Sequence, residues 1–218
     1  MTPSELRIKN FLKRIPPNAP PAVARNVETA LKLADRFSEK AAEIRANEKL
    51  SAQGKREQLL VMASGGFAGH WGQLHREANR ALAGIAGEIA GLRKRARDSL
   101  GEFSASLQRE VRDYLRSLNE SDRRRLTIES QDPLVLSSIL AAPAFLSGLN
   151  VEIYDHVEAR VVESAFGARL TELKVDHDAW ENAAAACEIA ANEISREVGV
   201  TSDGFKKLGT PSGQSEAA

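Results

Sequence analysis

The sequence predicts an all-α protein whose long amphipathic helices form an elongated helical bundle or a coiled-coil-like hairpin. Apolar residues recur at alternating spacings of three and four over long stretches, which places them on one face of a helix. Aromatic residues make up only 5% of the 218 residues and alanine is abundant, which favours helices that meet along narrow seams. No sustained alternation typical of strands is present.

Residues 1–21 predict a short helical arm followed by a proline-rich connector. Pro3 lies in the first turn of the expected helix, and the apolar face of that helix ends at Pro16. The segment 16–21 contains four prolines, which lack N–H donors and fix φ, so we expect a stiff extended connector there.

Residues 22–118 predict a long-helix hairpin. Its first seam follows a heptad-like pattern through Val23, Val27, Ala30, Ala34, Phe37, Ala41 and Ile44. Ser51 can cap a following helix that reaches Met62, and the glycines after Ser64 predict a flexible joint at which the chain bends or reverses.

The second seam of the hairpin begins at Trp71 and continues at the same spacing to Ala96. It extends to Leu118 as one helix unless Gly101 breaks it, and both alternatives stay open. On a neighbouring face, Ala83, Gly87 and Gly91 predict that a partner helix approaches closely. The candidate packing or interface residues come from this helix and from an apolar corner at residues 142–149. They are Trp71, Ile85, Gly87, Ile89, Gly91, Pro143, Phe145 and Leu146.

Residues 119–199 predict an acidic helical C-terminal region, and residues 200–218 a disordered tail. Short helices are expected at 123–128 and 133–141, and longer ones at 151–174 and 179–198. Pro143 and Gly148 bound the apolar corner between them. The tail is too polar and glycine-rich to compensate for the entropy of ordering it.

The charge is strongly divided along the chain although the net charge is zero. Residues 1–130 carry 24 Lys and Arg against 16 Asp and Glu, whereas residues 131–218 carry 6 against 14. Because basic and acidic residues are interleaved, we favour complementarity within one chain or between copies, and an anionic partner is the alternative.

No catalytic, metal or cofactor site can be nominated from the sequence, so we expect a protein that is not an enzyme. Cys187 is the only cysteine and lies in an alanine run, which excludes an internal disulfide. His70 and His75 are five residues apart, about 140° around a helix, unlike a zinc-binding pair. The cluster 176–178 (Asp-His-Asp) has residue types that bind metals, but Asp178 is better explained as a helix cap.

The chain is not expected to insert into a membrane. No apolar run approaches the roughly 20 residues that span a bilayer, and the closest, 81–92, contains Glu88. The first residues lack the charged-then-apolar layout of a signal peptide. We therefore expect a protein that is neither inserted into a membrane nor secreted.

Two basic clusters are candidate contacts for an anionic partner such as nucleic acid. They comprise Arg93, Lys94, Arg95 and Arg97, and Arg123, Arg124 and Arg125. No base-stacking aromatic residues are interleaved with them, so solvated helix faces or pairing with the acidic region is the simpler explanation. A regulatory protein that contacts nucleic acid is the alternative function.

The stretch 130–136 (Ser-Gln-Asp-Pro-Leu-Val-Leu) through 139–149 (Ile-Leu-Ala-Ala-Pro-Ala-Phe-Leu-Ser-Gly-Leu) resembles a segment of uncharacterised phage- and prophage-encoded helical proteins of proteobacteria. The resemblance extends in general layout over residues 25–195. It implies a virion or morphogenesis context and no reaction, and hence a location in the cytoplasm of a bacterial host or in a virion. The leading hypothesis is therefore a non-enzymatic structural or assembly protein that forms homo-oligomers or binds a larger particle.

Overall fold

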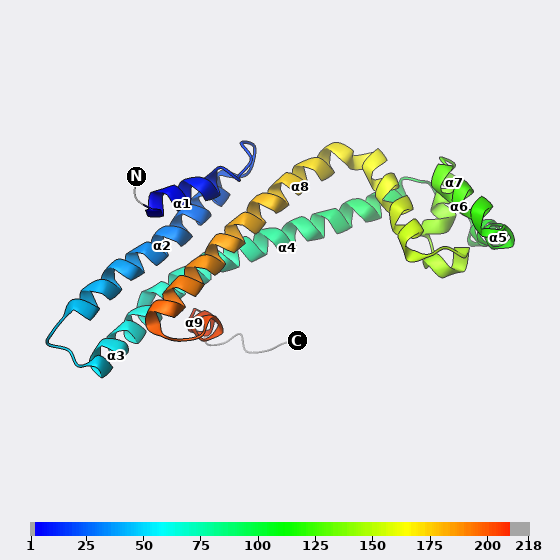
Figure 1. The fold of residues 1–218 in the computed structure, drawn as a ribbon. Coiled ribbons are helices and arrows are strands. Elements are labelled where there is room, and N and C mark those ends of the chain that lie inside the picture. Colours follow the sequence, from blue (N-terminus) through cyan, green and yellow to red (C-terminus); the bar gives the residue numbers. More distant parts are fainter. Residues whose placement is uncertain (1–2, 210–218) are drawn as a thin grey trace. The chain divides into compact units, whose positions relative to one another are not determined.

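A computed structural model describes residues 3–209 and confirms the all-α class (Figure 1). Helices pack against one another, and no strand occurs in the described range. The chain divides into two compact units, one from residues up to Ile85 and from Lys174 onward, and one from Ala86 to Leu173. We call them the terminal unit and the central unit. These units differ from the four consecutive segments predicted, because two helices, α4 (Ala68–Asp98) and α8 (Val151–Val198), each contribute to both.

The terminal unit has its core along the first predicted seam. Its other elements are α1 (Pro3–Leu12), α2 (Pro21–Ala46), α3 (Ala52–Met62), the π-helical turn η1 (Ala63–Phe67) and α9 (Ser202–Leu208). Val23, Val27 and Phe37 of α2 are completely buried, whereas Ile44 near the end of the seam is partly exposed. The heptad-like spacing therefore identified the buried face of α2 correctly over most of its length.

The connector between α1 and α2 is not extended, contrary to the prediction. The amide of Ala19 donates to the carbonyl of Pro16 at 3.0 Å, so the prolines form tight turns that fold α1 back along α2 (Figure 1). Arg7 of α1 fixes this arrangement by pairing with Asp35 at 2.8 Å and with Glu193 of α8.

The flexible joint predicted at the glycines after Ser64 is wrong, because the chain neither reverses nor leaves the helical conformation there. Residues 63–67 form a π turn that joins α3 to α4, and Ser51 caps α3 as predicted. The ring of Phe67 meets that of Phe37 edge to face at 5.0 Å, so packing on α2 fixes the wider turn.

The predicted disordered tail is wrong for its first part, because α9 is a helix that packs in the core. Thr201 caps it by accepting from the amide of Gly204 at 3.1 Å, and Phe205 is completely buried, 5.7 Å from Trp71. One capping residue and one aromatic anchor outweigh the glycine and lysine content that suggested disorder. Residues 210–218 lie outside the described range.

The central unit contains three short helices and a tight corner between the parts of α4 and α8 that belong to it. These elements are α5 (Ala105–Ser117), α6 (Glu120–Glu129), α7 (Pro133–Leu140) and the 3-10 turn η2 (Ala144–Ser147). α4 ends at Asp98 and Gly101 has a φ of 98°, so the alternative with a break at this glycine is the correct one.

Arginine side chains cover the C-terminal ends of all three short helices. Arg123 donates to carbonyls at the end of α5, Arg160 to those of Ile128 and Ser130 at the end of α6, and Arg112 to that of Ser138 in α7. Such contacts satisfy carbonyls that have no partner within their own helix and place positive charge at the negative end of the helix dipole.

α8 is continuous through residues 174–179, so the predicted boundary there and the capping role of Asp178 are wrong. The helix is instead interrupted at Phe166, whose φ of −140° and ψ of 24° are not helical. Residues 174–178 include no proline or glycine, and buried Leu173, Ala179 and Trp180 hold both flanks of the segment in the core.

The small-residue face of α4 is uncovered by the described residues, so the predicted close approach of a helix does not occur among them. A methyl group added to Gly87 would meet nothing within 4 Å, and one added to Gly91 would meet only the side chain of Arg95. Both Ala83 and Gly87 are exposed.

The division of charge along the sequence disappears within each unit. The terminal unit carries 18 Lys and Arg against 16 Asp and Glu, and the central unit carries 12 against 14. Basic residues of the first half pair with acidic residues of the second, as in Arg45 with Glu197 and Arg97 with Glu158. The complementarity is therefore satisfied at these positions inside one chain.

None of the described helices is long and apolar enough to cross a membrane.

Candidate functional site

The corner between α7 and α8 is a tightly constrained turn. Gly148 has a φ of 68°, which favours glycine, and its amide donates to the carbonyl of Phe145 at 3.0 Å. The amide of Leu149 donates to the carbonyl of Ala144 at 3.2 Å, and Arg123 donates to the carbonyl of Gly148 at 2.6 Å. The corner is thus hydrogen-bonded to itself and to α6.

This constrained turn presents large apolar side chains to solvent. Phe145 is 71% exposed and Val151 66% exposed, while Ser147 and Leu149 between them are buried. We call the exposed set, Pro143, Phe145, Leu146 and Val151, the Gly148 corner. Large apolar side chains exposed together often mark sites of protein interaction.

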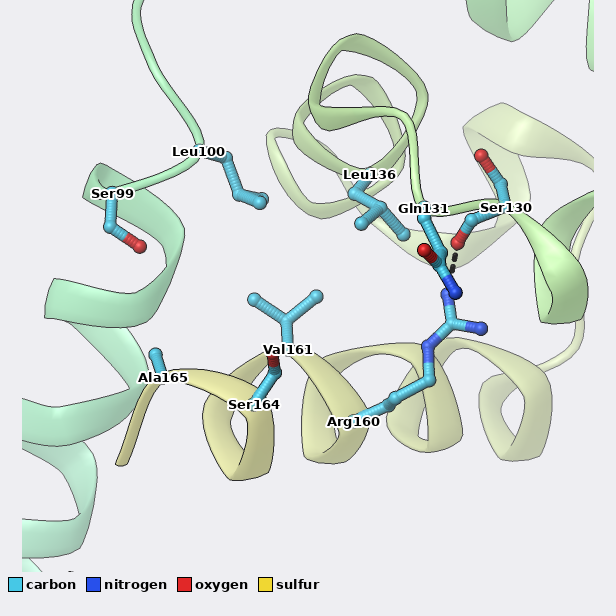
Figure 2. A pocket seen from close by; sticks show the side chains of 9 residues that line it. All are labelled: Ser99, Leu100, Ser130, Gln131, Leu136, Arg160, Val161, Ser164 and Ala165. Atoms are coloured by element: carbon cyan, nitrogen blue, oxygen red, sulfur yellow. Dashed lines mark hydrogen bonds between the residues drawn. The ribbon is translucent and has the colours of Figure 1, made fainter. Parts of the chain in front are cut away.

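A cleft of about 470 Å³ lies elsewhere in the central unit, between the end of α4, the connection of α6 to α7, and α8 (Figure 2). Its lining residues are Ser99, Leu100, Ser130, Gln131, Leu136, Arg160, Val161, Ser164 and Ala165. Arg160 reaches from α8 to the carbonyl of Ser130, with the amide of Gln131 nearby (Figure 2). The volume falls within the range typical of small-ligand sites.

Most arginines of the first basic cluster contact groups within the central unit. Arg93 and Arg97 both face Glu158, which is 8% exposed, and Arg95 lies over the ring of Phe166 at 5.7 Å. Partial burial opposes the charge of Arg97, but the hydrogen bond and charge of Glu158 outweigh it and raise the pKa of the guanidinium.

The second basic cluster has one structural member and two surface members. Arg123 donates to four backbone carbonyls, whereas Arg125 pairs with Asp122 at 3.0 Å on the surface. Lys94 of the first cluster and Arg124 of the second are exposed. The two clusters therefore do not combine into one free basic surface, because most of their charges serve the fold.

The remaining packing candidates separate into core and surface. Trp71 and Ile85 are buried, and the indole N–H of Trp71 donates to the carbonyl of Cys187 at 2.8 Å. Ile89 and Gly91 are partly exposed, and Gly87 is exposed.

Cys187, His75 and His177 of the terminal unit differ in their surroundings. Burial raises the pKa of the Cys187 thiol to about 12, with help from the charges of Glu188 and Glu77. His75 stacks on Trp71, and burial lowers its pKa despite Glu188 at 3.6 Å. The ligand atoms of His177, Asp178 and Glu181 lie within 4.8 Å of one another on the surface, and their contacts are with each other.

The sequence pointed to Pro143, Phe145 and Leu146 of the corner but missed Val151 and the cleft. The sequence marked Val151 only as the start of a helix, and Arg160 has no basic neighbour or motif around it. Comparison with protein-family models, curated proteins and solved structures returned no match. The geometry of the corner and the cleft is therefore the basis for proposing a function.

Proposed function

We propose that this chain is a non-enzymatic helical structural or assembly protein, associated with a phage or prophage, that binds copies of itself or a larger particle through the Gly148 corner. The observation that carries the proposal is the exposure of Phe145 on a turn held by Arg123. Exposed apolar side chains that lie together on one constrained turn favour a site for a partner, whereas single exposed apolar residues are ordinary.

The rigidity of the corner favours association. Side chains on a mobile loop lose conformational entropy when a partner binds, whereas Phe145 and Val151 flank a turn already fixed by backbone hydrogen bonds. Aromatic anchors of this kind contribute most of the binding free energy in many interfaces.

The charge of the chain is consistent with a second copy as the first partner. The net charge at pH 7 is zero, so no long-range repulsion keeps copies apart. The four residues of the corner are uncharged, so association through the corner should depend on apolar contact and tolerate salt.

The phage or prophage context depends on the resemblance of residues 130–149 described above. Mass spectrometry of purified virions from the strain that encodes the chain tests this context. Stoichiometric presence of the protein in virions is the expected result for a structural component, and its absence from virions at every stage of assembly would contradict that role.

A matched pair of variants tests the corner itself. Val151 and Val61 are exposed to nearly the same extent, 66% and 68%, but only Val151 belongs to the corner. Sedimentation velocity is expected to show weaker self-association for Val151→Ser and unchanged self-association for Val61→Ser. Equal behaviour of the two variants would overturn the assignment.

A further inference from the structure

The lining of the cleft in the central unit combines one charged side chain with polar and aliphatic ones. Arg160 is the charged residue among those that line it, and no carboxylate is among them. Leu100, Leu136 and Val161 also line the space, and Leu100 and Val161 lie at the end away from the guanidinium (Figure 2). A ligand that fits this lining combines a negative group with a short apolar body.

Arg160 retains donors for such a ligand. It donates one hydrogen bond to each of two carbonyls, those of Ile128 and Ser130, although a guanidinium has five N–H donors. Arg123, by contrast, makes four bonds to carbonyls. Within the described part of the chain no ion pair involves Arg160, so its charge is met only by the dipoles of carbonyl groups.

The polar residues beside Arg160 suit a carboxylate. Ser130 and Gln131 lie at the guanidinium end of the cleft, and Ser164 lies one helical turn from Arg160 on α8. Hydroxyl and amide groups can donate to the oxygens of a carboxylate alongside a guanidinium, and charge-assisted bonds of this kind are the stronger ones.

We propose that this cleft binds a small carboxylate that carries an apolar group, with the carboxylate on Arg160 and the apolar group against Leu100, Leu136 and Val161. The carboxylate could belong to a free aliphatic acid or to the C terminus of a peptide with an apolar last residue. The ligand chemistry is the same in both cases, and it is independent of the Gly148 corner.

Calorimetric titration of the full chain tests the proposal. Octanoate represents the free acid and N-acetyl-Ala-Leu the peptide terminus, and the neutral amide of each is the comparison. At least one of the two carboxylates is expected to bind ten times more tightly than its amide, and which one does so identifies the source. Equal affinities of each acid and its amide, or no binding of either acid, would overturn the proposal.

A pair of variants at Ser164 locates the binding. Ser164 is exposed and lines the cleft, so Ser164→Glu adds a repulsive charge without disturbing the core, and Ser164→Gln adds nearly the same volume without charge. Ser164→Glu is expected to weaken carboxylate binding at least tenfold, while Ser164→Gln retains most of it. If the two variants bind the carboxylate equally well, the ligand does not occupy this cleft.

Discussion

Gly72 of α4 and Gly209 after α9 meet backbone to backbone. A methyl group on Gly72 would overlap the carbonyl oxygen of Gly209, and one on Gly209 would overlap that of Ala68 and come within 3.1 Å of the Trp71 ring. Arg76 of α4 also donates to the carbonyl of Gly209 at 3.0 Å. These contacts hold α9, with buried Phe205, against the rest of the terminal unit.

Gly72→Ala is predicted to loosen α9. The added methyl group must push away the backbone of residue 209, which costs about 1–3 kcal/mol in a well-packed site. Amide hydrogen exchange at residues 202–209 should become faster, and the urea midpoint of the terminal unit should fall.

Gly69→Ala is the matched control for that variant, because Gly69 lies on the same helix with nothing within 4 Å of its added methyl group. Alanine in an exposed helical position is more favourable than glycine by about 0.5–1 kcal/mol. The urea midpoint should therefore rise. A similar loss of stability in both variants would show that the close approach at Gly72 is not the cause.

Arg123→Gln is predicted to destabilise the central unit by about 1–3 kcal/mol, because it removes the guanidinium donors from the carbonyls of Leu118 and Gly148. Its neighbour Arg124 is exposed, so Arg124→Gln should change stability by less than about 0.5 kcal/mol. Denaturant unfolding of both proteins measures the difference. Equal stabilities would refute the structural role of Arg123.

Stability is predicted to fall above pH 9 in a way that depends on Cys187. Burial raises the pKa of this thiol from 9.0 to about 12 in the folded chain, so between these values only the unfolded chain loses the proton. The contribution of the buried thiol to the free energy of unfolding is complete below pH 9, and it falls by about 1.4 kcal/mol per pH unit above pH 9. Unfolding at pH 8, 9 and 10 should show a steeper decline for the wild type than for Cys187→Ala. Parallel declines would contradict the raised pKa.

Sequence periodicity predicted the fold class because the helices bury narrow apolar stripes. Val23, Val27 and Phe37 follow the spacing of a helix face, and that face is the core of the terminal unit. The π turn at 63–67 and the helix α9 escaped prediction because their packing partners, Phe37 and Trp71, are distant in the sequence. Local composition at glycine-rich segments carries no information about such partners.

The candidate sites were predictable only where a local pattern marked them. Pro143 and Gly148 signalled a corner, but the sequence could not show that Phe145 points outward while Leu149 points inward. The cleft brings residues 99–100, 130–136 and 160–165 together, and no local pattern relates these segments. The division of charge along the sequence predicted complementarity within one chain or between copies, but the individual pairs, such as Arg97 with Glu158, depend on the tertiary fold.

The most direct test of the central claim, that the Gly148 corner is a surface for self-association, is light scattering of the purified chain over a concentration series at low and high salt. We predict an oligomer whose mass rises with concentration and which persists at high salt. In Phe145→Ser the mass should fall to that of the monomer. A monomer at about 100 μM in both salts, or an oligomer unchanged by Phe145→Ser, would contradict it, since an interface centred on an aromatic anchor loses about 2 kcal/mol or more when that anchor is removed.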